Sequence, residues 1–389
     1  MENFVLHNPT KIVFGKNTIQ LIGEETVFFG KNVLLVYGRK SLKESGLYDL
    51  IRSALDGAGA KIIEHSGVQT NPLHGHVMEG VAKCKTHNCN VICAAGGGSV
   101  IDEAKAISAG ALVRHDVWKF LTGKKSIKKA LPVTAVPTLA ASGSEANSGM
   151  VITHEIKNLK FGFANRHLFP KTSILDPLTT CSVPASFTAY GAVDMLSHFL
   201  ELYFSGGGKE SPVQDSLIEG MIANTIKSTD RCLTAPDDYR ARADLMWIAS
   251  LALNGIFSAG LGKVEFPVHL IEHAISALYD VPHGAGLAVI IPGWMKYSRA
   301  KQSFRIAQLG EKALSIEKGT VDFCSVAVIE YLLRWFSSIN VPTSLEEIGV
   351  GEKDISRIAD NALAQAKVWR MKDISAEAIE QVLHLCMKG

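Results

Sequence analysis

One aspartate and four histidines in the second half of the chain have the types and spacing of a metal site. Asp194 and His198 are four residues apart, and so are His269 and His273, so each pair lies on one face of a helix. His283 follows ten residues after His273. A carboxylate with several imidazoles suits a divalent ion such as zinc or iron and can leave one coordination position open. The sequence therefore predicts a site for one divalent metal.

A run of three glycines and a serine, Gly96–Ser99, has the character of a phosphate-binding turn. It follows a short apolar segment, Val91–Ala95, and opens a helical stretch. Glycines there allow backbone N–H groups to approach a pyrophosphate, and the N-terminus of a helix favours negative charge. The run can also be a tight turn in which Ser99 and Asp102 cap the helix, and the two interpretations are compatible. We predict that it binds the phosphates of a nucleotide.

The residues after an earlier expected strand, Asn32–Tyr37, indicate which nucleotide is bound. The strand is followed by Gly38, Arg39, Lys40 and Ser41, and Glu44 is the first carboxylate after Gly38. An acidic side chain at such a position would bind a ribose 2′-hydroxyl, whereas an arginine accommodates a 2′-phosphate. We therefore predict that NADP(H) is preferred over NAD(H). The alternative is an exposed basic loop without a ligand.

The elements that must position these residues fall into two groups. In the first half, strand-like and helix-like segments alternate, which is typical of βαβ units and a parallel sheet. Strands are expected at Asn32–Tyr37, Lys61–His65, Val91–Ala95 and Leu131–Val136, with helices at about 47–58 and 76–86.

From Val183 and Pro184 onward the chain is a succession of amphipathic helices. We expect them at about 189–203, 213–228, 238–258, 268–279, 285–299, 321–338 and 354–366, with a flexible loop at Ser205–Gly208. The predicted organisation is an α/β dinucleotide-binding domain over residues 1–183 and an all-helical metal-binding domain over residues 184–389. The active site is expected in the cleft between them.

Composition narrows the possible functions and locations. The 389 residues are 47% hydrophobic and 20% charged with a net charge of +2, which argues against a nucleic-acid or basic membrane surface. Seven cysteines without a Cys-x-x-Cys pair favour free thiols in a reducing compartment. The first residues show neither a basic segment nor an apolar core of a secretory signal, so a cytoplasmic location is expected.

Together these motifs resemble the iron-containing (group III) alcohol dehydrogenases, most closely the butanol dehydrogenase and broad aldehyde reductase branch. The segments that carry the resemblance are Asn8–Gly15, Asn71-Pro72, Gly96–Asp102, Thr138 with Ser142–Glu145, Lys160–Ala164, Ser173–Pro177, Asp194 with His198, His269 with His273, Pro282–Ala288 and Pro342–Gly351.

The resemblance implies a metal-dependent, NAD(P)-linked alcohol dehydrogenase or aldehyde reductase that acts on a small alcohol or aldehyde and forms a homodimer. It implies that Asp194, His198, His269 and His283 hold Fe²⁺ or Zn²⁺, and that His273 relays a proton without binding the metal. It also implies that the cofactor is lined by Gly38, Asn71, Gly97, Gly98, Ser99, Asp102, Thr138 and Lys160. We add Arg39, Ser41, Ser142, Asn147 and Thr179 as further candidates.

One departure from the family pattern lies before the first histidine of the pair. Close relatives carry Gly-Asp-Trp-Ala-Thr where this chain has Val264-Glu-Phe-Pro-Val268. Pro267 is compatible with the first turn of a helix. The changed side chains leave the identity of the substrate open.

Two alternatives differ in class. The match of His269-Leu-Ile-Glu272-His273 to the His-x-x-Glu-His signature of a zinc peptidase would make His273 a ligand and Glu272 the base that activates water. In the dehydrogenase interpretation, Glu272 points away and does no chemistry. The other alternative is a metal-dependent lyase or glycerol-phosphate dehydrogenase on the same architecture, which needs a basic pocket for a phosphorylated substrate.

Overall fold

The computed structural model describes residues 1–205 and 211–388, which form two compact units. The α/β unit comprises His7–Val183 and Ala235–Asn254, and the helical unit comprises Met1–Leu6, Pro184–Thr234 and Gly255–Gly389. The division differs from the expected boundary at residue 183, because Met1–Leu6 belong to the helical unit and Ala235–Asn254 belong to the α/β unit. Apart from Ser205, the loop expected at Ser205–Gly208 lies outside the described residues.

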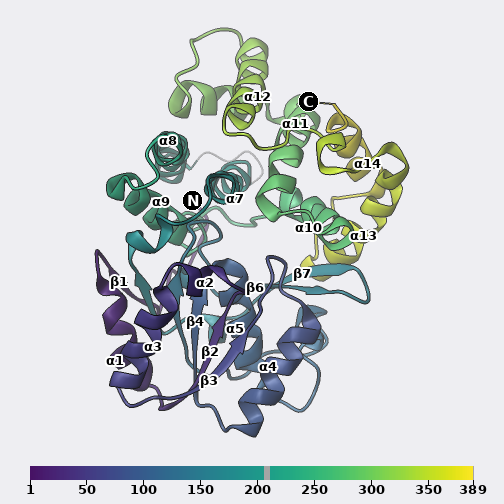
Figure 1. Ribbon diagram of the computed structural model, residues 1–389. Helices are drawn as coiled ribbons and strands as arrows, with labels where there is room; N and C mark the ends of the chain where they lie inside the picture. The colour runs from purple at the N-terminus through teal and green to yellow at the C-terminus, as the bar shows by residue number, and fades with distance from the viewer. Residues whose placement is uncertain (206–210, 389) are drawn as a thin grey trace. The chain divides into compact units, whose positions relative to one another are not determined.

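A six-stranded sheet, with every pair of neighbours parallel, forms the centre of the α/β unit (Figure 1). Its order is β1-β8-β5-β4-β2-β3. The strands are β1 (Lys11–Phe14), β2 (Asn32–Tyr37), β3 (Lys61–Ser66), β4 (Val91–Gly96), β5 (Val133–Pro137) and β8 (Thr172–Leu175). The predicted parallel sheet is confirmed, and its central strands are the expected buried apolar runs.

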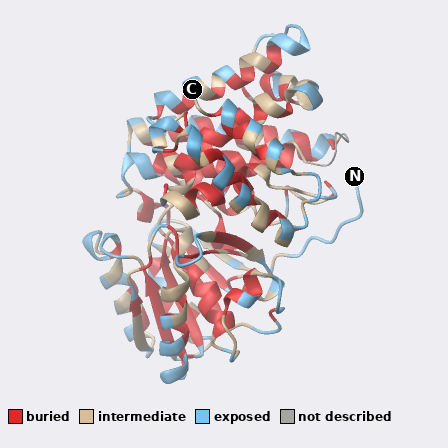
Figure 2. Ribbon diagram, turned by 90° about the vertical axis from the view of Figure 1, so that its right-hand side faces the viewer, coloured by how far each residue is buried: buried red, intermediate tan, exposed pale blue. Residues whose placement is uncertain are grey.

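Helices cover the sheet because the central strands are apolar on both faces. Val33, Leu35 and Tyr37 of β2 pack in one core cluster with residues of α1 (Ile22–Val27) and α3 (Leu47–Gly57). The alternate residues of β2 are equally buried and belong to the other face, and α5 (Gly98–Gly110) packs against β2, β4 and β5. Figure 2 shows the strands buried and the helices exposed on their outer sides.

The remaining elements of the α/β unit include an antiparallel hairpin that the sequence did not predict. It is formed by β6 (Gly149–His154) and β7 (Leu159–Ala164). The other helices of this unit are α2 (Ser41–Glu44), α4 (His74–Thr86), α6 (Trp118–Leu121) and α9 (Tyr239–Ala252), with 3₁₀ turns that include η2 (Ser144–Ala146) and η4 (Pro177–Thr180).

The strand order identifies where a ligand should bind on this sheet. After β2 the chain adds β3 on one side and then β4 on the other, so the order reverses between β2 and β4. In open α/β sheets ligands bind outside the carboxyl ends of the strands at such a switch point. Gly38 follows the carboxyl end of β2, and Gly96–Ser99 follows that of β4.

The helical unit is built around two buried helices. Its helices are α7 (Ala185–Tyr203), α8 (Pro212–Thr234), α10 (Pro267–Tyr279), α11 (His283–Ala313), α12 (Val321–Ser338), α13 (Ile355–Trp369) and α14 (Ala376–Leu385). Helix α11 packs against α7, α10, α12 and α14, and α7 is buried along most of its length. Helix α10 ends at Asp280 in the left-handed conformation with φ of 52°, and Pro282 then precedes α11. This reversal returns His283 towards α10.

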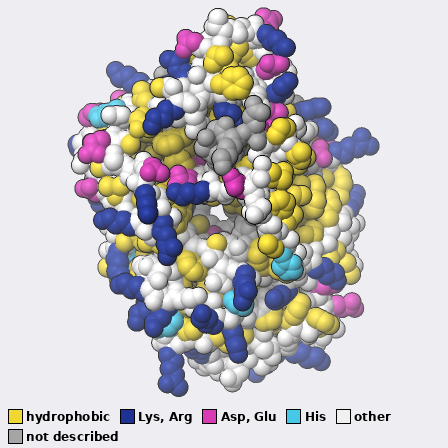
Figure 3. All heavy atoms as spheres, turned by 180° about the vertical axis from the view of Figure 1, so that it is seen from behind, with side chains coloured by type: hydrophobic (Ala, Val, Ile, Leu, Met, Phe, Trp, Pro, Cys, Tyr) yellow, Lys and Arg dark blue, Asp and Glu magenta, His cyan; other side chains and the backbone are white. Residues whose placement is uncertain are grey.

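Surface properties of the described residues fit the near-neutral charge of the chain. On the face drawn in Figure 3, lysine and arginine side chains are scattered among other types and do not merge into one patch. Within the part of the chain that the structure describes, no helix combines the length and the apolar character needed to cross a membrane.

Candidate metal and cofactor sites

Four side chains of the helical unit converge on one point. Oδ1 of Asp194 lies 3.5 Å from Nε2 of His198 and 3.7 Å from Nε2 of both His269 and His283. Ligand atoms about 2.1 Å from a tetrahedral zinc ion would be roughly 3.4 Å apart. Oδ1 of Asp194 and Nε2 of His269 are buried and have no hydrogen-bond partner among the described residues. The donor set therefore fits a divalent metal ion.

Two buried carboxylates bond two of these imidazoles at Nδ1, the ring nitrogen that faces away from Asp194. Glu201 Oε2 accepts a bond from Nδ1 of His269, and Glu272 Oε2 accepts one from Nδ1 of His283. A bond at Nδ1 leaves the lone pair on Nε2, and it fixes the orientation of the ring. Glu201 also accepts from the backbone N–H of Val268 at 2.6 Å, which anchors it to the first turn of α10.

The electrostatics of the point are those of a cation site. Burial alone would raise the pKa of Asp194, but the imidazoles of His198, His269 and His283 lower it to about 2. Burial lowers the pKa of His198 to about 4, although Asp194 acts against this shift. At neutral pH Asp194 is therefore an anion, and His198 is neutral and able to offer a lone pair.

His273 lies beside this point, and one of its ring nitrogens lies within 4.8 Å of donor atoms of Glu272 and His283. Its ring centroid is 6.1 Å from that of His269 and 5.6 Å from that of His283. Nδ1 of His273 lies 3.1 Å from Oε1 of Gln365 in α13, and Trp369 packs edge-on at 5.7 Å. Donation from Nδ1 to the amide oxygen leaves Nε2 of His273 as the nitrogen that can exchange a proton.

The geometry corrects the expectation for Glu272 and does not fit the peptidase alternative. Glu272 does not point away, because it is fully buried and binds the imidazole of His283 directly. A water-activating base cannot be committed to a ligand in this way. Glu201 was not predicted from the sequence, and Glu272 was considered only as a peptidase base. Glu201 is seven residues from Asp194 and Glu272 is three from His269, so each shares a helix face with a candidate ligand.

The glycine turn of the α/β unit closely approaches the loop that follows β5. A Cβ at Gly98 would lie 2.1 Å from Oγ of Ser142, so a larger residue there would require Ser142 to move. The expected capping by Ser99 and Asp102 is wrong, since Ser99 instead donates to the backbone oxygen of Thr70. Asp102 accepts bonds from Ser144 Oγ at 2.5 Å and from the backbone N–H of Val151 at 2.9 Å.

A buried lysine that the sequence reasoning missed organises the neighbouring loop. Nζ of Lys105 donates to Ser144 Oγ at 2.8 Å, to Asn147 Oδ1 at 3.1 Å and to the backbone oxygen of Gly149 at 2.7 Å. Burial lowers its pKa to about 8, although Asp102 and other acidic neighbours act in the opposite direction. Asn147 is thereby engaged within the loop.

Of the other candidate cofactor residues, Thr138 and Thr179 lie near the carboxyl end of β5, whereas Lys160 is the second residue of β7. Thr138 follows β5, and its backbone N–H donates to the oxygen of Gly96 at 3.1 Å. Thr179 donates its hydroxyl to the oxygen of Pro137 at 3.0 Å, which joins η4 to the end of β5. Asn71 and Lys160 are buried in the same unit.

At the end of β2, Gly38 is pinned to the turn after β3. The N–H of Gly67 donates to the oxygen of Gly38 at 3.1 Å. Arg39 and Ser41 are exposed beside it, as is the first acidic side chain that follows, Glu44.

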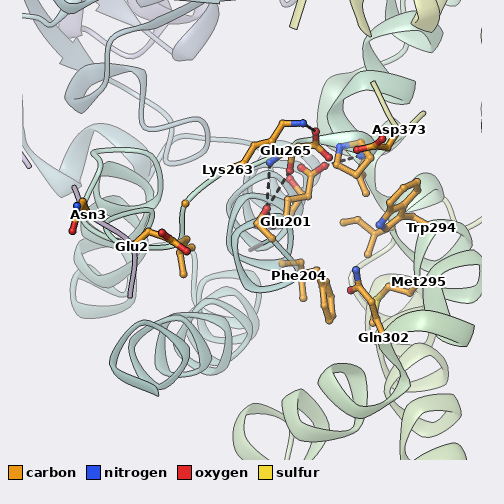
Figure 4. A pocket seen from close by; sticks show the side chains of 18 residues that line it. Glu2, Asn3, Glu201, Phe204, Lys263, Glu265, Trp294, Met295, Gln302 and Asp373 are labelled. Atoms are coloured by element: carbon orange, nitrogen blue, oxygen red, sulfur yellow. Dashed lines mark hydrogen bonds and ion pairs between the residues drawn. The ribbon is translucent and has the colours of Figure 1, made fainter. Parts of the chain in front are cut away.

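A cavity of about 900 Å³ lies within the helical unit (Figure 4). It is lined by side chains that include Glu201, Phe204, Glu265, Trp294 and Gln302. Asp194 and the three imidazoles that converge on its Oδ1 are not among the lining residues. Glu201, which bonds Nδ1 of His269, is among them, so the cavity reaches this carboxylate but not the proposed ligands. Its wall contains part of the departure noted at residues 264–268, in which Pro267 takes the first position of α10 as expected.

Two family models match the chain, one over its N-terminal part and one over its C-terminal part. The model "Iron-containing alcohol dehydrogenase" matches residues 9–177, and the model for the C-terminal part of the Fe-containing alcohol dehydrogenase family matches residues 188–387. This chain belongs to the iron-containing alcohol dehydrogenase family. The predicted resemblance is confirmed, and with it an oxidoreductase that uses a divalent metal and a nicotinamide cofactor.

Relatives within this family share nearly the whole length of the chain. The "Probable NADH-dependent butanol dehydrogenase 1" of Bacillus subtilis is 39% identical over 98% of this chain and 99% of its own. The "NADPH-dependent aldehyde reductase YqhD" of Escherichia coli is 33% identical over 91% of each chain. The crystal structure of "NADH-dependent butanol dehydrogenase A" from Thermotoga maritima is 40% identical, with a TM-score of 0.96 over 100% of this chain and 99% of that one.

Proposed function

We propose that this member of the iron-containing alcohol dehydrogenases reduces a small aldehyde to its alcohol, or runs the reverse reaction, with NADP(H) and one Fe²⁺ or Zn²⁺ ion. The observation that carries the proposal is the convergence of three Nε2 atoms on Oδ1 of Asp194 at ligand-to-ligand distances. Butanol dehydrogenases and an aldehyde reductase among the relatives support a small primary alcohol or aldehyde as substrate.

In this proposal Asp194, His198, His269 and His283 hold the metal. When bound there, the metal supplies a Lewis acid that polarises the carbonyl oxygen and stabilises the charge that develops on it. Glu201 and Glu272 keep the δ-protons on their histidines, so that the ε-nitrogens stay available as ligands.

The remaining chemistry is a hydride and a proton transfer. The nicotinamide cofactor supplies the hydride when bound. His273 delivers the proton to the alkoxide oxygen, directly or through a water, and Gln365 holds its ring by the bond at Nδ1. Hydride and proton together convert one aldehyde into one alcohol.

We assign the cofactor to the switch point of the sheet. The turn Gly97–Ser99 and the start of α5 are proposed to bind the pyrophosphate. Gly38, Arg39 and Ser41 are proposed to meet the 2′-phosphate of NADP(H). We propose that the lining of the cofactor site is completed by Asn71, Asp102, Thr138, Ser142, Asn147, Lys160 and Thr179. Asp102 and Asn147 would contribute by holding the loop after β5 through their hydrogen bonds. Because the relatives' names include both NADH-dependent and NADPH-dependent enzymes, this preference needs its own test.

The decisive experiment combines metal analysis with a substrate panel. Protein purified without added metal is assayed for iron and zinc, and NADPH and NADH oxidation are followed with aldehydes of increasing chain length. We expect one metal per chain and a kcat/KM for NADPH at least about tenfold above that for NADH, equivalent to about 1.4 kcal/mol. Gly38→Asp should reduce this ratio, because the new carboxylate repels a 2′-phosphate. Equal use of both cofactors by the wild type would contradict the NADP assignment, and absence of metal-dependent turnover would contradict the function.

We also retain a cytoplasmic homodimer as a proposal. The seven cysteines are all free thiols, which suits a reducing compartment. Phe4 and Val5 are exposed apolar residues that a second copy could cover. Sedimentation equilibrium would test the dimer.

A further inference from the structure

A second group of histidine and carboxylate side chains lies in the α/β unit, apart from the residues assigned to metal and cofactor above. Leu73 and Thr153 form an isolated parallel bridge, and the N–H of Thr153 donates to the oxygen of Pro72 at 2.8 Å. The next residue on each side is a histidine. His74 opens α4 and His154 ends β6, so the bridge places the two imidazoles together.

The two rings have the geometry of a ligand pair. Their centroids are 4.6 Å apart with an interplanar angle of 19°, and for the proposed ligands His198 and His269 the corresponding values are 4.6 Å and 11°. One nitrogen of each ring and a carboxylate oxygen of Glu155 all lie within 4.8 Å of one another.

Neighbouring groups orient these side chains as they do in the proposed catalytic site. Nε2 of His74 lies 2.7 Å from Oδ1 of Asp116, so donation to this carboxylate leaves the lone pair on Nδ1. Oε1 of Glu155 accepts from the backbone N–H of Gly75 at 3.0 Å, which fixes the carboxylate over the first turn of α4.

An unpartnered nitrogen points to a missing ligand. The side chain of His154 is part of a residue that is only 8% exposed, and its Nδ1 is buried without a hydrogen-bond partner among the described residues. A buried polar atom without a partner is unfavourable unless a ligand or water satisfies it. A metal ion would satisfy it, and exposed Glu155 leaves a path to solvent.

We propose that His74, His154 and Glu155 bind a second divalent transition-metal ion of zinc-like ligand preference, with Asp116 orienting His74. Two imidazoles and one carboxylate, completed by water, form an ordinary zinc donor set. The ion would tie the start of α4 to the end of β6, next to the Asn71-Pro72 segment.

A comparison within the same unit shows why this group is preferred to another. His65, His76 and Glu103 also cluster, but Glu103 Oε1 lies 2.9 Å from Nε2 of His65 and 2.6 Å from Nδ1 of His76. These are hydrogen-bond distances. Nδ1 of His65 and Oε2 of Glu103 also have no hydrogen-bond partner among the described residues, but the carboxylate already bonds both imidazoles, and a metal would have to separate these bonds.

The test is a count of bound zinc in untagged, full-length protein. Wild type, His154→Gln, Glu155→Gln and the control His87→Gln, which changes an exposed histidine at the end of α4, are dialysed against the same low concentration of free Zn²⁺ and analysed for zinc. We expect wild type and His87→Gln to hold one equivalent more than His154→Gln and Glu155→Gln. Equal zinc content in all four proteins would overturn the proposal.

Two further readouts separate metal binding from misfolding and from the catalytic site. Glu155 is exposed, so Glu155→Gln should retain the wild-type circular dichroism while losing the extra equivalent. Trp118 packs edge-on against His154 at 4.9 Å, so Cu²⁺ at this site should quench a component of tryptophan fluorescence in wild type that is not quenched in His154→Gln. Identical quenching in both proteins would also refute the site. Because the group is separate from Asp194, its failure would leave the proposed dehydrogenase function untouched.

Discussion

Replacing Glu272 provides a strong test of how the helical unit builds its metal site. Glu272 is fully buried and bonds through Oε2 to Nδ1 of His283 and through Oε1 to the hydroxyl of Ser276. A Cβ on Gly286 would come within 2.9 Å of its Cγ, so the side chain has little room to move. Removing the Glu272 carboxylate should therefore leave Nδ1 of His283 without a partner, because the surroundings are too tightly packed to supply another.

The expected magnitude differs between two substitutions. In Glu272→Gln the amide oxygen can still accept from His283, so only the charge is lost, and we expect metal affinity to fall about tenfold. In Glu272→Ala the δ-nitrogen loses its partner, and we expect a loss of about a hundredfold. These are the two ends of the range for residues behind a metal ligand, about 1.4 to 2.7 kcal/mol.

The assay is a competition between apo-protein and a chelating dye for Zn²⁺, followed by turnover at saturating metal. Glu330→Gln, which changes a largely exposed glutamate of α12, serves as control and should behave as wild type. Wild-type metal affinity in both Glu272 variants would refute the role assigned to this carboxylate. Normal affinity with abolished turnover would instead indicate that Glu272 acts on substrate or water.

Three other outcomes follow from the same geometry. His283→Ala should lose the metal and most turnover but still bind NADPH, which elemental analysis and a fluorescence titration would show; retained stoichiometric metal would contradict the ligand set. His273→Ala should keep its metal while kcat falls roughly a hundredfold, as for a removed proton donor, and loss of metal would make His273 a ligand. With the pKa of Lys105 near 8 in the folded protein, the unfolded chain retains a proton above pH 8 that the native state releases. The free energy of unfolding of the wild type, relative to that of Lys105→Met, should therefore rise between pH 8 and 10 by up to about 1.4 kcal/mol per pH unit. Urea denaturation of both proteins measures this, and a constant difference between them across this range would contradict the expectation.

Much of the α/β architecture could be read from local sequence. Asn32–Tyr37 was predicted with the bounds that β2 has, because a buried parallel strand is a continuous apolar run between turn residues. Strand β1 was missed, since Lys11–Phe14 lies at the edge of the sheet and is partly exposed. The β6–β7 hairpin, at Gly149–Ala164, was missed although Val151, Ile152, Phe161 and Phe163 favour strands, so the sequence carried a signal for it.

The metal residues were predictable as pairs on single helices but not as a set. Spacing of four placed Asp194 with His198, whereas the approach of α7 to α10 depends on packing that no local pattern encodes. The roles of Glu201 and Glu272 depend on the same packing, so helical spacing alone gave no reason to choose them. Lys105 was missed for a related reason, because its partners are 39 to 44 residues further along the chain.

The path of the chain between the two units has a consequence for how the protein is loaded. Between the ligands of α7 and those of α10 and α11, the chain leaves the helical unit, contributes Ala235–Asn254 to the α/β unit and returns. An ion coordinated by His198 and His269 would thus close a loop that contains the whole segment Ala235–Asn254. Closing such a loop reduces the freedom of the unfolded chain, so metal uptake would stabilise residues that never touch the ion. A gene exchange that swapped halves at residue 183 would separate α9 from the η2 and η4 turns it packs against. The recombinant would inherit a nucleotide-binding half that lacks one of its own helices.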